Sequence, residues 1–346
     1  MRIPGYRVEG IACLFLLLLG AGRITAQPGN IGHSGVHSAQ TIAPREKLKV
    51  IFDTDIGDDI DDAFALALLI SRPEVEVLGV TTAWGDTALR ARLTERFLAS
   101  AGKAEIPIFT GPKTVESTVF SQERYALGDV HPAAWPDAIA FTLDAIRRDP
   151  GEITLIAVAP FSNMGALIDR DPVTFRKLKR VVLMGGSIHR GYGDLGYSTH
   201  PHPTPEYNVF SDVASSRKLL ASGVPISMMP LDSTQLKLDE VKRDLVFSHG
   251  TPLTDALTLL YHQWSASTGT PTPTLYDAMA AAAAIRPELC PTTPMHLRID
   301  DKGNTIPEAG PANADVCLES DSEQFFRFYL TSILANPPAG NAKSPD

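Results

Sequence analysis

Short apolar runs rich in β-branched residues alternate with longer amphipathic runs along most of the chain. Six of the short runs have the length and composition of buried strands, namely residues 50–52, 75–82, 106–109, 153–158, 181–184 and 226–229. Helical patterns separate most of them, at residues 63–70, 87–100, 136–148, 175–179 with its approach, and 213–222. This alternation predicts an α/β fold with a mostly parallel central sheet flanked by helices. Ligands of such sheets bind at the C-terminal ends of the strands.

The second half of the chain departs from this simple alternation. Residues 232–270 read as helical with a loop, and residues 275–285 are a strong helix candidate with Asp277 in the first turn. Residues 185–205 contain Gly, Tyr, His and Pro with little periodicity. A loop of this length inside a compact domain is usually functional or disordered, so we interpret it as a lid over a site.

The beginning of the sequence has the pattern of an export signal. Arg2 and Arg7 precede a short apolar core, which predicts a signal peptide at residues 1–26 and a periplasmic or secreted protein. Residues 27–46 predict a flexible lead-in, and residues 47–340 a single α/β domain. No later apolar run reaches membrane-spanning length. Cys290 and Cys317 could pair in an exported protein, but the sequence does not show whether they do.

The overall charge limits the class of partner. The chain has 40 acidic and 31 basic residues, a net charge of -9, which argues against a nucleic-acid polymer as a partner. A small-molecule substrate fits better.

The acidic residues concentrate where the first predicted strand meets the first predicted helix. Residues 53–62 read Asp-Thr-Asp-Ile-Gly-Asp-Asp-Ile-Asp-Asp, with six carboxylates in ten positions. Two unit charges about 4 Å apart repel by roughly 4 kcal/mol at an effective dielectric near 20. A hard divalent cation such as calcium or magnesium would relieve this repulsion, because carboxylate oxygens are its preferred ligands.

Three other structures of this acidic segment compete with a cation site. A solvated loop is the usual state of a charge run, but a tight strand-to-helix junction makes it less favoured here. An EF-hand is excluded, because Gly57 and Phe64 stand at the fifth and twelfth positions counted from Asp53. An aspartyl-phosphate phosphatase also ends a strand in Asp-x-Asp and stays open at this point.

Four further segments lie after predicted strands or at helix starts: Ala-Pro-Phe-Ser-Asn-Met at 159–164, Met-Gly-Gly at 184–186, Pro-Glu-Tyr-Asn-Val-Phe-Ser-Asp at 205–212, and Leu-Tyr-Asp-Ala at 275–278. Together with Asp-Thr-Asp-x-Gly and Asp-Asp-Ala in the acidic segment, they resemble the nucleoside hydrolase family, the inosine-uridine type N-ribohydrolases. The order and content agree along nearly the whole predicted mature chain. The resemblance implies a nucleoside hydrolase-like α/β fold with its active site at the C-terminal ends of the strands.

The resemblance also implies a calcium ion. Its ligands would be a bound water, two ribose hydroxyls and four groups of the chain: Asp55, Asp62, the carbonyl of Ser162, and Asp277. Asp55 would also be the catalytic base that takes a proton from the water. Oxygen ligands of this number and kind are those that calcium prefers.

Substrate contacts are implied in the same way. Asp61 would accept a hydrogen bond from a ribose hydroxyl, and Met184 would lie against the sugar ring. Glu206 and Asn208 would hold the 5′ end, and Asn163 would make supporting or binding contacts. Carboxylates around C1′ suit the oxocarbenium-like state through which a C1′–N bond breaks.

Some positions depart from the family pattern. The acidic segment has two extra residues between Asp55 and Asp61, so Asp58 and Asp59 are either metal ligands or solvent-facing turn residues. Asp86 stands where many members have Asn, and it either contacts the acidic segment or caps the next helix.

The acid that protonates the leaving group is open. Tyr276 stands where familiar members often have His, and a phenol with a pKa near 10 is a poor general acid. The alternatives are His131 and three histidines in or beside the long loop, His189, His200 and His202, of which His200 and His202 are favoured. Trp84 and Tyr197 either stack on a base or are packing residues.

The sequence therefore predicts a calcium-dependent hydrolase that cleaves a ribonucleoside or related ribosyl compound into base and ribose, as in purine or pyrimidine salvage. The resemblance also implies a homo-oligomer. A calcium-dependent sugar-binding protein without activity is the main alternative, supported by Tyr276. The phosphatase is less favoured, because Gly57 occupies a motif position that needs Thr or Val, and because it leaves Glu206, Asn208 and Asp277 without a role. The base preference stays open.

Overall fold

The computed structural model describes residues 46–115, 118–127, 134–195, 197 and 202–335. Contacts along the chain separate Met1–Pro44 from Arg45–Asp346, and every described residue belongs to the second unit. The predicted signal peptide and residues 27–45 of the predicted lead-in lie outside the described residues. No helix in the described ranges is long and apolar enough to cross a membrane.

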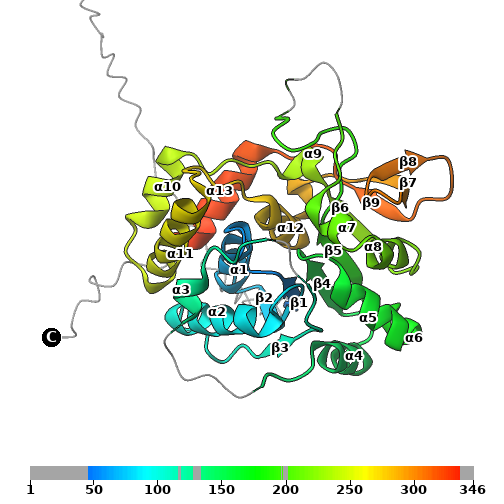
Figure 1. The fold of residues 1–346 in the computed structure, drawn as a ribbon, viewed down its shortest axis with the longest axis horizontal. Coiled ribbons are helices and arrows are strands. Elements are labelled where there is room, and N and C mark those ends of the chain that lie inside the picture. Colours follow the sequence, from blue (N-terminus) through cyan, green and yellow to red (C-terminus); the bar gives the residue numbers. More distant parts are fainter. Residues whose placement is uncertain (1–45, 116–117, 128–133, 196, 198–201, 336–346) are drawn as a thin grey trace, which may run out of the picture. The chain divides into compact units, whose positions relative to one another are not determined.

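A nine-stranded sheet forms the centre, in the order β3-β2-β1-β4-β5-β6-β9-β7-β8 (Figure 1). The strands are β1 (Leu48–Thr54), β2 (Val75–Thr82), β3 (Ile108–Thr110), β4 (Ile153–Ala157), β5 (Arg180–Met184), β6 (Ile226–Met229), β7 (Thr293–Ile299), β8 (Thr305–Glu308) and β9 (Ala314–Val316). β1 to β6 and β9 pair in parallel, whereas β7 is antiparallel to both β8 and β9. The predicted α/β class with a mostly parallel sheet is confirmed.

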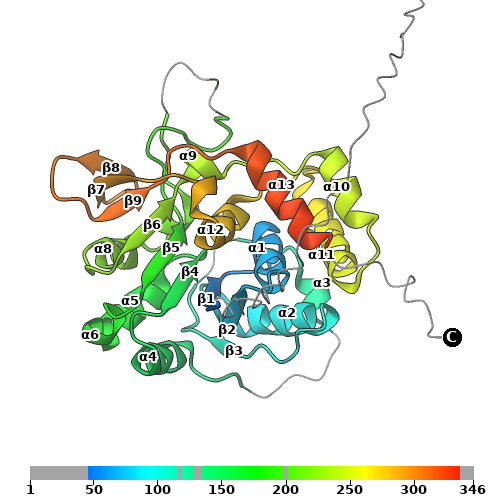
Figure 2. The same ribbon diagram turned by 180° about the vertical axis from the view of Figure 1, so that it is seen from behind.

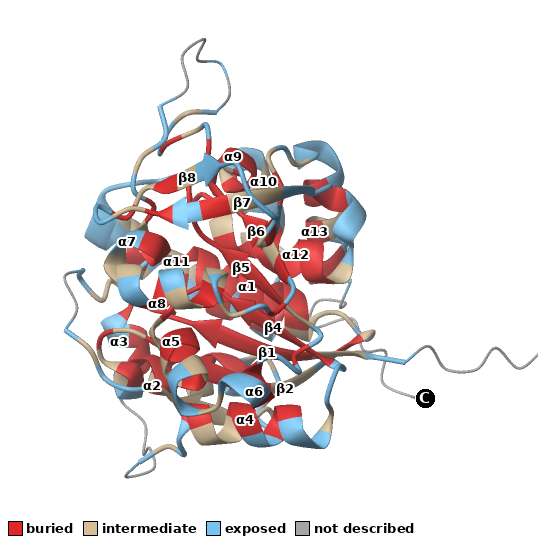
Figure 3. Ribbon diagram, turned by 90° about the vertical axis from the view of Figure 1, so that its right-hand side faces the viewer, coloured by how far each residue is buried: buried red, intermediate tan, exposed pale blue. Residues whose placement is uncertain are grey.

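Alternate residues of the central strands supply two separate cores, one on each face of the sheet. In β1, Val50 and Phe52 pack into one core and Ile51 into the other. Because successive side chains of a strand point to opposite faces, a strand covered on both sides needs apolar residues at every position. The central strands are accordingly buried along most of their length (Figure 3).

Helices cover both faces (Figures 1 and 2). The first core is covered by α1 (Asp61–Ile70), α2 (Thr87–Ser100), α11 (Pro252–Thr268), α12 (Tyr276–Ile285) and α13 (Ser322–Ile333). The second is covered by α4 (Ala138–Arg148), α5 (Ser162–Arg170), α6 (Pro172–Phe175) and α8 (Val213–Leu220). Shorter elements complete the described chain: α3 (Glu123–Ala126), α7 (Tyr207–Ser211), α9 (Leu231–Thr234), α10 (Glu240–Phe247) and the 3-10 helix η1 (Pro287–Leu289).

The pairing of α1 with α12 brings two distant acidic segments together. Both helices are buried along nearly their whole length, and they pack closely against each other. The alanines of α12 allow this close approach. Asp61 and Asp62 in the first turn of α1 therefore lie near Asp277 in the first turn of α12.

The helix predicted at residues 175–179 with its approach is confirmed for the approach and wrong for residues 176–179. The approach is α6, which Asp171 caps and Pro172 begins, and it ends at Phe175. Residues 176–179 form turns and bends before β5. The segment predicted as helical with a loop, 232–270, contains α10 and α11 and most of α9.

Cys290 and Cys317 form a disulfide, which answers the question that the sequence left open. It joins the residue after η1 to the residue after β9, with the two Cα atoms 5.6 Å apart. The bond therefore ties the C-terminal strands to the end of α12 and η1.

Candidate active site

A cavity of about 400 Å³ opens at the C-terminal ends of β1, β4 and β5. Its walls come from the acidic loop after β1, residues 118–121, the residue after β4, the end of β5, Tyr192, the start of α7, the end of α11 and the start of α12. β1 has β2 on one side and β4 on the other, so the chain changes direction across the sheet at this point. Such a switch point is where open α/β sheets bind their ligands.

Three buried carboxylates lie together at the bottom of this pocket. Oxygen atoms of Asp61, Asp62 and Asp277 lie within 4.8 Å of one another. Burial and the neighbouring carboxylates raise the pKa of all three well above the usual value. The backbone N–H of Asp277 donates to Asp61 at 3.3 Å, and the Thr54 hydroxyl donates to Asp62. These donors leave much of the charge uncompensated, so the set fits a hard cation with oxygen ligands.

Asp55 lies beside this group. It is buried at the end of β1, and its charge helps to raise the pKa of Asp61 and Asp277. Its oxygens are outside the group of three, so the closest carboxylate set shares only Asp62 and Asp277 with the predicted calcium ligands. Ser162 starts α5 after β4 and is not among the residues that line the pocket, so its carbonyl as a ligand stays a prediction.

Arg90 of α2 is a cation that the sequence interpretation missed. Its guanidinium is fully buried, donates to the carbonyl oxygens of Asp55 and Ile56, and forms an ion pair with Asp58 at 3.1 Å. Arg90 lies on the same face of α2 as Leu93, Thr94 and Phe97, all buried. An arginine on an inward helical face needs a buried acidic partner, so this spacing was a usable signal.

The extra residues of the acidic loop are attachment points for a neighbouring segment. Asp58 accepts a hydrogen bond from the Thr118 hydroxyl at 2.5 Å, and its carbonyl accepts one from Ser121 at 2.6 Å. Gln122 donates to the carbonyl of Asp59 at 2.6 Å. Asp58 is therefore ion-paired with Arg90 and only 13% exposed, so the description as a solvent-facing turn residue is wrong for Asp58.

The opposite wall of the pocket contains Glu206, Asn208 and Met184, as the sequence predicts. Glu206 caps α7 and accepts hydrogen bonds from the backbone N–H groups of Gly186 at 2.9 Å, Asn208 at 3.0 Å and Val209 at 3.1 Å. Its burial raises its pKa to about 7. The Asn208 side-chain amide donates to the carbonyls of Val158 and Met184, each at 3.0 Å.

Asn163 is buried behind the pocket lining and makes supporting contacts there. Its amide donates to the carboxylate of Asp53 at 2.6 Å and to the carbonyl of Thr82 at 3.2 Å. Asp53 also accepts a hydrogen bond from Thr81 at 2.6 Å, and burial raises its pKa to about 7. Asn163 is 1% exposed and is not part of the pocket lining, so its contacts are supporting ones.

The remaining candidates divide between the pocket and its surroundings. Tyr276 lines the pocket, and burial raises its pKa to about 12. Asp86 caps α2 by accepting from the Leu89 N–H at 3.0 Å and pairs with Lys113 at 2.6 Å. The capping interpretation is confirmed, and a contact of Asp86 with the acidic pocket is wrong.

No histidine of the described residues lines the pocket. His202 is exposed and pairs through its backbone with Arg190. His189 is also exposed, and its backbone N–H donates to the carboxylate of Asp232 at 2.8 Å. His131 and His200 lie outside the described residues.

Trp84 and Tyr197 also lie outside the pocket lining. The residues in the lining that the sequence interpretation missed are Thr118, Val119, Ser121, Val158, Tyr192, Tyr207, Trp264, Ser267 and Thr268.

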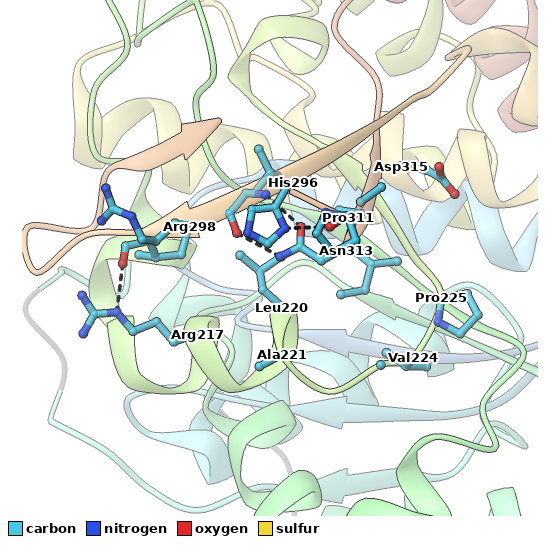
Figure 4. Close-up of a pocket in the computed structure, with 16 residues that line it drawn as sticks. Arg217, Leu220, Ala221, Val224, Pro225, His296, Arg298, Pro311, Asn313 and Asp315 are labelled. Carbon is cyan, nitrogen blue, oxygen red and sulfur yellow. Dashed lines mark hydrogen bonds between the residues drawn. The ribbon is translucent and has the colours of Figure 1, made fainter. Parts of the chain in front are cut away.

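A larger hollow of about 870 Å³ lies between α8 and the β7–β9 strands (Figure 4). Its polar side chains are used locally: Arg217 donates to the carbonyl of Ile299 at 2.9 Å, and the His296 ring contacts the carbonyl of Pro311 at 2.7 Å. Its lining contains one carboxylate, Asp315. The hollow lacks a cluster of acidic groups, so the smaller acidic pocket is the candidate active site.

The fold and the pocket together define an α/β protein with a carboxylate-rich site at the switch point of its sheet. Residues 50–327 match the model of the inosine-uridine preferring nucleoside hydrolase family. The chain belongs to this family, and it is a ribonucleoside N-ribohydrolase.

Curated relatives agree with this family. The chain is 27% identical to pyrimidine-specific ribonucleoside hydrolase RihB of Escherichia coli over 81% of its own length and 95% of the relative. It is 27% identical to uridine nucleosidase 1 of Arabidopsis thaliana over 78% of its length and 83% of the relative. It is 30% identical to the uncharacterized protein C1683.06c of Schizosaccharomyces pombe over 57% of its length, and it spans 65% of that relative.

Solved structures agree in fold. The plant nucleoside hydrolase PpNRh1 and the purine-preferring ribonucleoside hydrolase of Gardnerella vaginalis each superpose with a TM-score of 0.71 at 22% identity. Each match covers 83% of this chain, and 99% and 98% of the respective structure.

Proposed function

We propose that the protein is a calcium-dependent hydrolase that cleaves the N-glycosidic bond of a ribonucleoside or related ribosyl compound and releases base and ribose. The observation that carries the proposal is the group of three buried carboxylates, Asp61, Asp62 and Asp277, at the switch point of the sheet. Buried like charges are stable only with a cation or with retained protons. Asp55, Asp62, Asp277 and the Ser162 carbonyl would hold the ion, with Asp61 next to them.

A bound calcium ion would make a coordinated water more acidic and fix the two ribose hydroxyls. The carboxylate of Asp55 accepts the proton of the attacking water, since it lies at the edge of the acidic group. Asp61 accepts a hydrogen bond from a ribose hydroxyl, and Met184 packs against the sugar. The negative charge of the pocket favours the cationic character that develops at C1′ as the bond to the base breaks.

Protonation of the leaving base is the step with the fewest candidates. Tyr276 lines the pocket, but its raised pKa of about 12 keeps the phenol protonated at neutral pH. It is therefore a hydrogen-bond donor to the base rather than a group that loses a proton completely. This arrangement suits bases that leave with limited protonation.

The decisive experiment measures release of reducing sugar from a panel of nucleosides, with uridine first because two relatives carry uridine or pyrimidine in their names. Asp55→Asn should lower kcat by about 10²–10⁴-fold, which is the usual contribution of a general base. Asp86→Asn is the matched control, because Asn also caps helices and Asp86 lies outside the pocket.

Three outcomes would change this proposal. Near wild-type turnover by Asp55→Asn would exclude Asp55 as the base. Binding of nucleosides without any product would favour the sugar-binding protein. Full activity after chelation and dialysis would exclude the dependence on calcium.

We also propose export to the periplasm or the medium through residues 1–26. The Cys290–Cys317 disulfide supports this, because such bonds persist in oxidising compartments. A homo-oligomer is a further part of the proposal, and light scattering of the purified protein tests it.

A further inference from the structure

Arg90 holds the backbone of the acidic loop as well as the side chain of Asp58. Its guanidinium donates to the carbonyl oxygen of Asp55 and to that of Ile56, the latter at 3.1 Å. Its two terminal nitrogens also donate to the two carboxylate oxygens of Asp58, at 3.2 Å and 3.1 Å. A forked contact of this kind fixes the orientation of both groups. One buried side chain therefore holds the loop at the proposed base and again three residues later.

The same side chain holds the turn that follows β2. The Nε of Arg90 donates to the carbonyl of Trp84 at 2.8 Å. Trp84 has a φ of 62°, in the left-handed region, which is unfavourable for a residue with a side chain. Such a conformation persists only where the surroundings enforce it, and the bond from Arg90 is one of the contacts that do so. Arg90 thus joins the loops that follow two neighbouring strands, β1 and β2.

Phe120 confines the acidic loop from another direction. The Cζ of Arg90 lies 5.4 Å from the centroid of the Phe120 ring. Gly57 has a φ of 126°, and a Cβ at this position would lie 2.1 Å from the same ring. The loop therefore has little space in which to move away from Arg90.

We propose that Arg90 is the positioning residue of the base: through the carbonyls of Asp55 and Ile56 it fixes the backbone from which the Asp55 carboxylate extends. Asp58 keeps the guanidinium in place, which gives a role to one of the two extra residues of the loop. This inference rests on the proposed function, since it concerns the same base and the same calcium ion.

The first test is Arg90→Lys, which keeps the charge but loses the planar fork. At saturating calcium, kcat for uridine should fall by about 10²-fold, the effect of misplacing a catalytic group by about 1 Å. KM should change little, because the proposed sugar contacts Met184, Glu206 and Asn208 lie on the opposite wall. The Kd of calcium, measured by calorimetry, should rise by about ten-fold or more, as when a residue that orients metal ligands is replaced.

A double variant, Arg90→Met with Asp58→Leu, separates positioning from stability. Replacing both partners of a buried ion pair by apolar side chains is often neutral or stabilising, whereas removing one partner leaves an uncompensated charge. The double variant should therefore fold even if Arg90→Lys does not. A merely structural role of Arg90 predicts wild-type kcat in this variant, whereas positioning predicts the loss of about 10²-fold, because the carbonyls of Asp55 and Ile56 still lose their donor.

Two results overturn the proposal. One is wild-type kcat and calcium affinity in either variant of Arg90. The other is an equal loss of kcat in Asp58→Asn, which leaves the arginine at the two carbonyls and should cost less than Arg90→Lys. An equal loss would assign the effect to the Asp58 carboxylate.

Arg180→Lys is the matched control. Arg180 also donates to a backbone carbonyl, that of Ala284 at 2.8 Å, but it stands at the start of β5, whereas the pocket opens at the C-terminal ends of the strands. Its kcat and calcium Kd should equal those of the wild type. The calcium Kd of Arg90→Lys needs no turnover, so it tests Arg90 even if no nucleoside is cleaved, an outcome that would contradict only the proposed function. If the wild type cleaved uridine without binding calcium, kcat would decide in the same way.

Discussion

The pocket contains two kinds of buried carboxylate, and they differ in what faces them. Glu206 is surrounded by donors, since it accepts hydrogen bonds from three backbone N–H groups. Asp61, Asp62 and Asp277 mainly face one another, and their charges oppose each other. A carboxylate that the chain itself satisfies holds the fold together, whereas a carboxylate left facing others indicates a site for something that the chain does not provide.

The acidic loop contains both kinds of carboxylate, and Asp58 is the example with donors. It lies three residues before Asp61, yet it belongs with Glu206, because Arg90 and Thr118 satisfy it. Acidic residues that are adjacent in the sequence therefore have different roles. The role of each carboxylate depends on the donors that face it, and the donors to Asp58 come from α2 and from the segment before α3.

The largest expected effect is that of Asp277→Asn. Removing one of three opposed charges should raise the melting temperature of the metal-free protein, because the repulsion falls. The same change should abolish stabilisation by calcium and lower kcat/KM by orders of magnitude. Calorimetric melts with EDTA and with calcium, together with the nucleoside assay, measure both effects.

Asp144→Asn is the control for Asp277→Asn, since Asp144 forms an exposed pair with Arg147 and should change neither quantity. If Asp277→Asn destabilised the metal-free protein, the three carboxylates would not be opposed in the way described.

Glu206→Gln should destabilise the metal-free protein, the opposite of the effect expected for Asp277→Asn. The amide group of Gln presents N–H protons to backbone N–H donors, so at least one buried donor loses its acceptor. We expect a loss of about 1–3 kcal/mol in the free energy of unfolding. Urea denaturation measures it, and an unchanged midpoint would show that the donors around Glu206 contribute no net stability.

Asp239→Asn is the matched control for Glu206→Gln. Asp239 also caps a helix, α10, but at the surface, and Asn caps helices equally well. Its midpoint should stay within about 0.5 kcal/mol of the wild type, as for most surface changes.

The sequence predicts those parts of the molecule that depend on local patterns. The bounds of β2, α2 and β6 agree with the predicted ranges, because each has a clear apolar period and flanking turn residues. The acidic loop, Asp277, Glu206, Asn208 and Met184 all reach the predicted pocket, since the C-terminal ends of parallel strands meet there.

The parts that the sequence did not predict depend on contacts between distant segments. Arg90 becomes a partner of Asp58 only when α2 packs beside the acidic loop. Tyr192 reaches the pocket lining because Gln235 anchors its turn from another element. β8 and β9 are short, and all three of β7, β8 and β9 are partly exposed, so their apolar pattern is weak.

The smallest expected effect is the pH dependence of stability without calcium. Burial raises the pKa of Glu206 to about 7 from 4.5, and the pKa values of Asp61, Asp62 and Asp277 also rise. In the unfolded chain these groups lose their protons near pH 4, whereas in the folded protein they lose them at higher pH. The folded state thus binds more protons between these values, and stability falls as the pH rises through this range.

In EDTA, the contribution of these groups to the melting temperature should therefore decrease from about pH 4.5 to pH 7.5. Calcium should remove most of this decrease, because the ion replaces the protons in the acidic group. Asp277→Asn should reduce the slope in EDTA, while Asp144→Asn should keep it. If the melting temperature in EDTA depended on pH in the same way in the wild type and in Asp277→Asn, the acidic group would not be the cause of the pH dependence. Glu206 and Asp53, whose pKa values burial raises to about 7, would then remain as its sources, and the contrast between the two kinds of carboxylate would be lost.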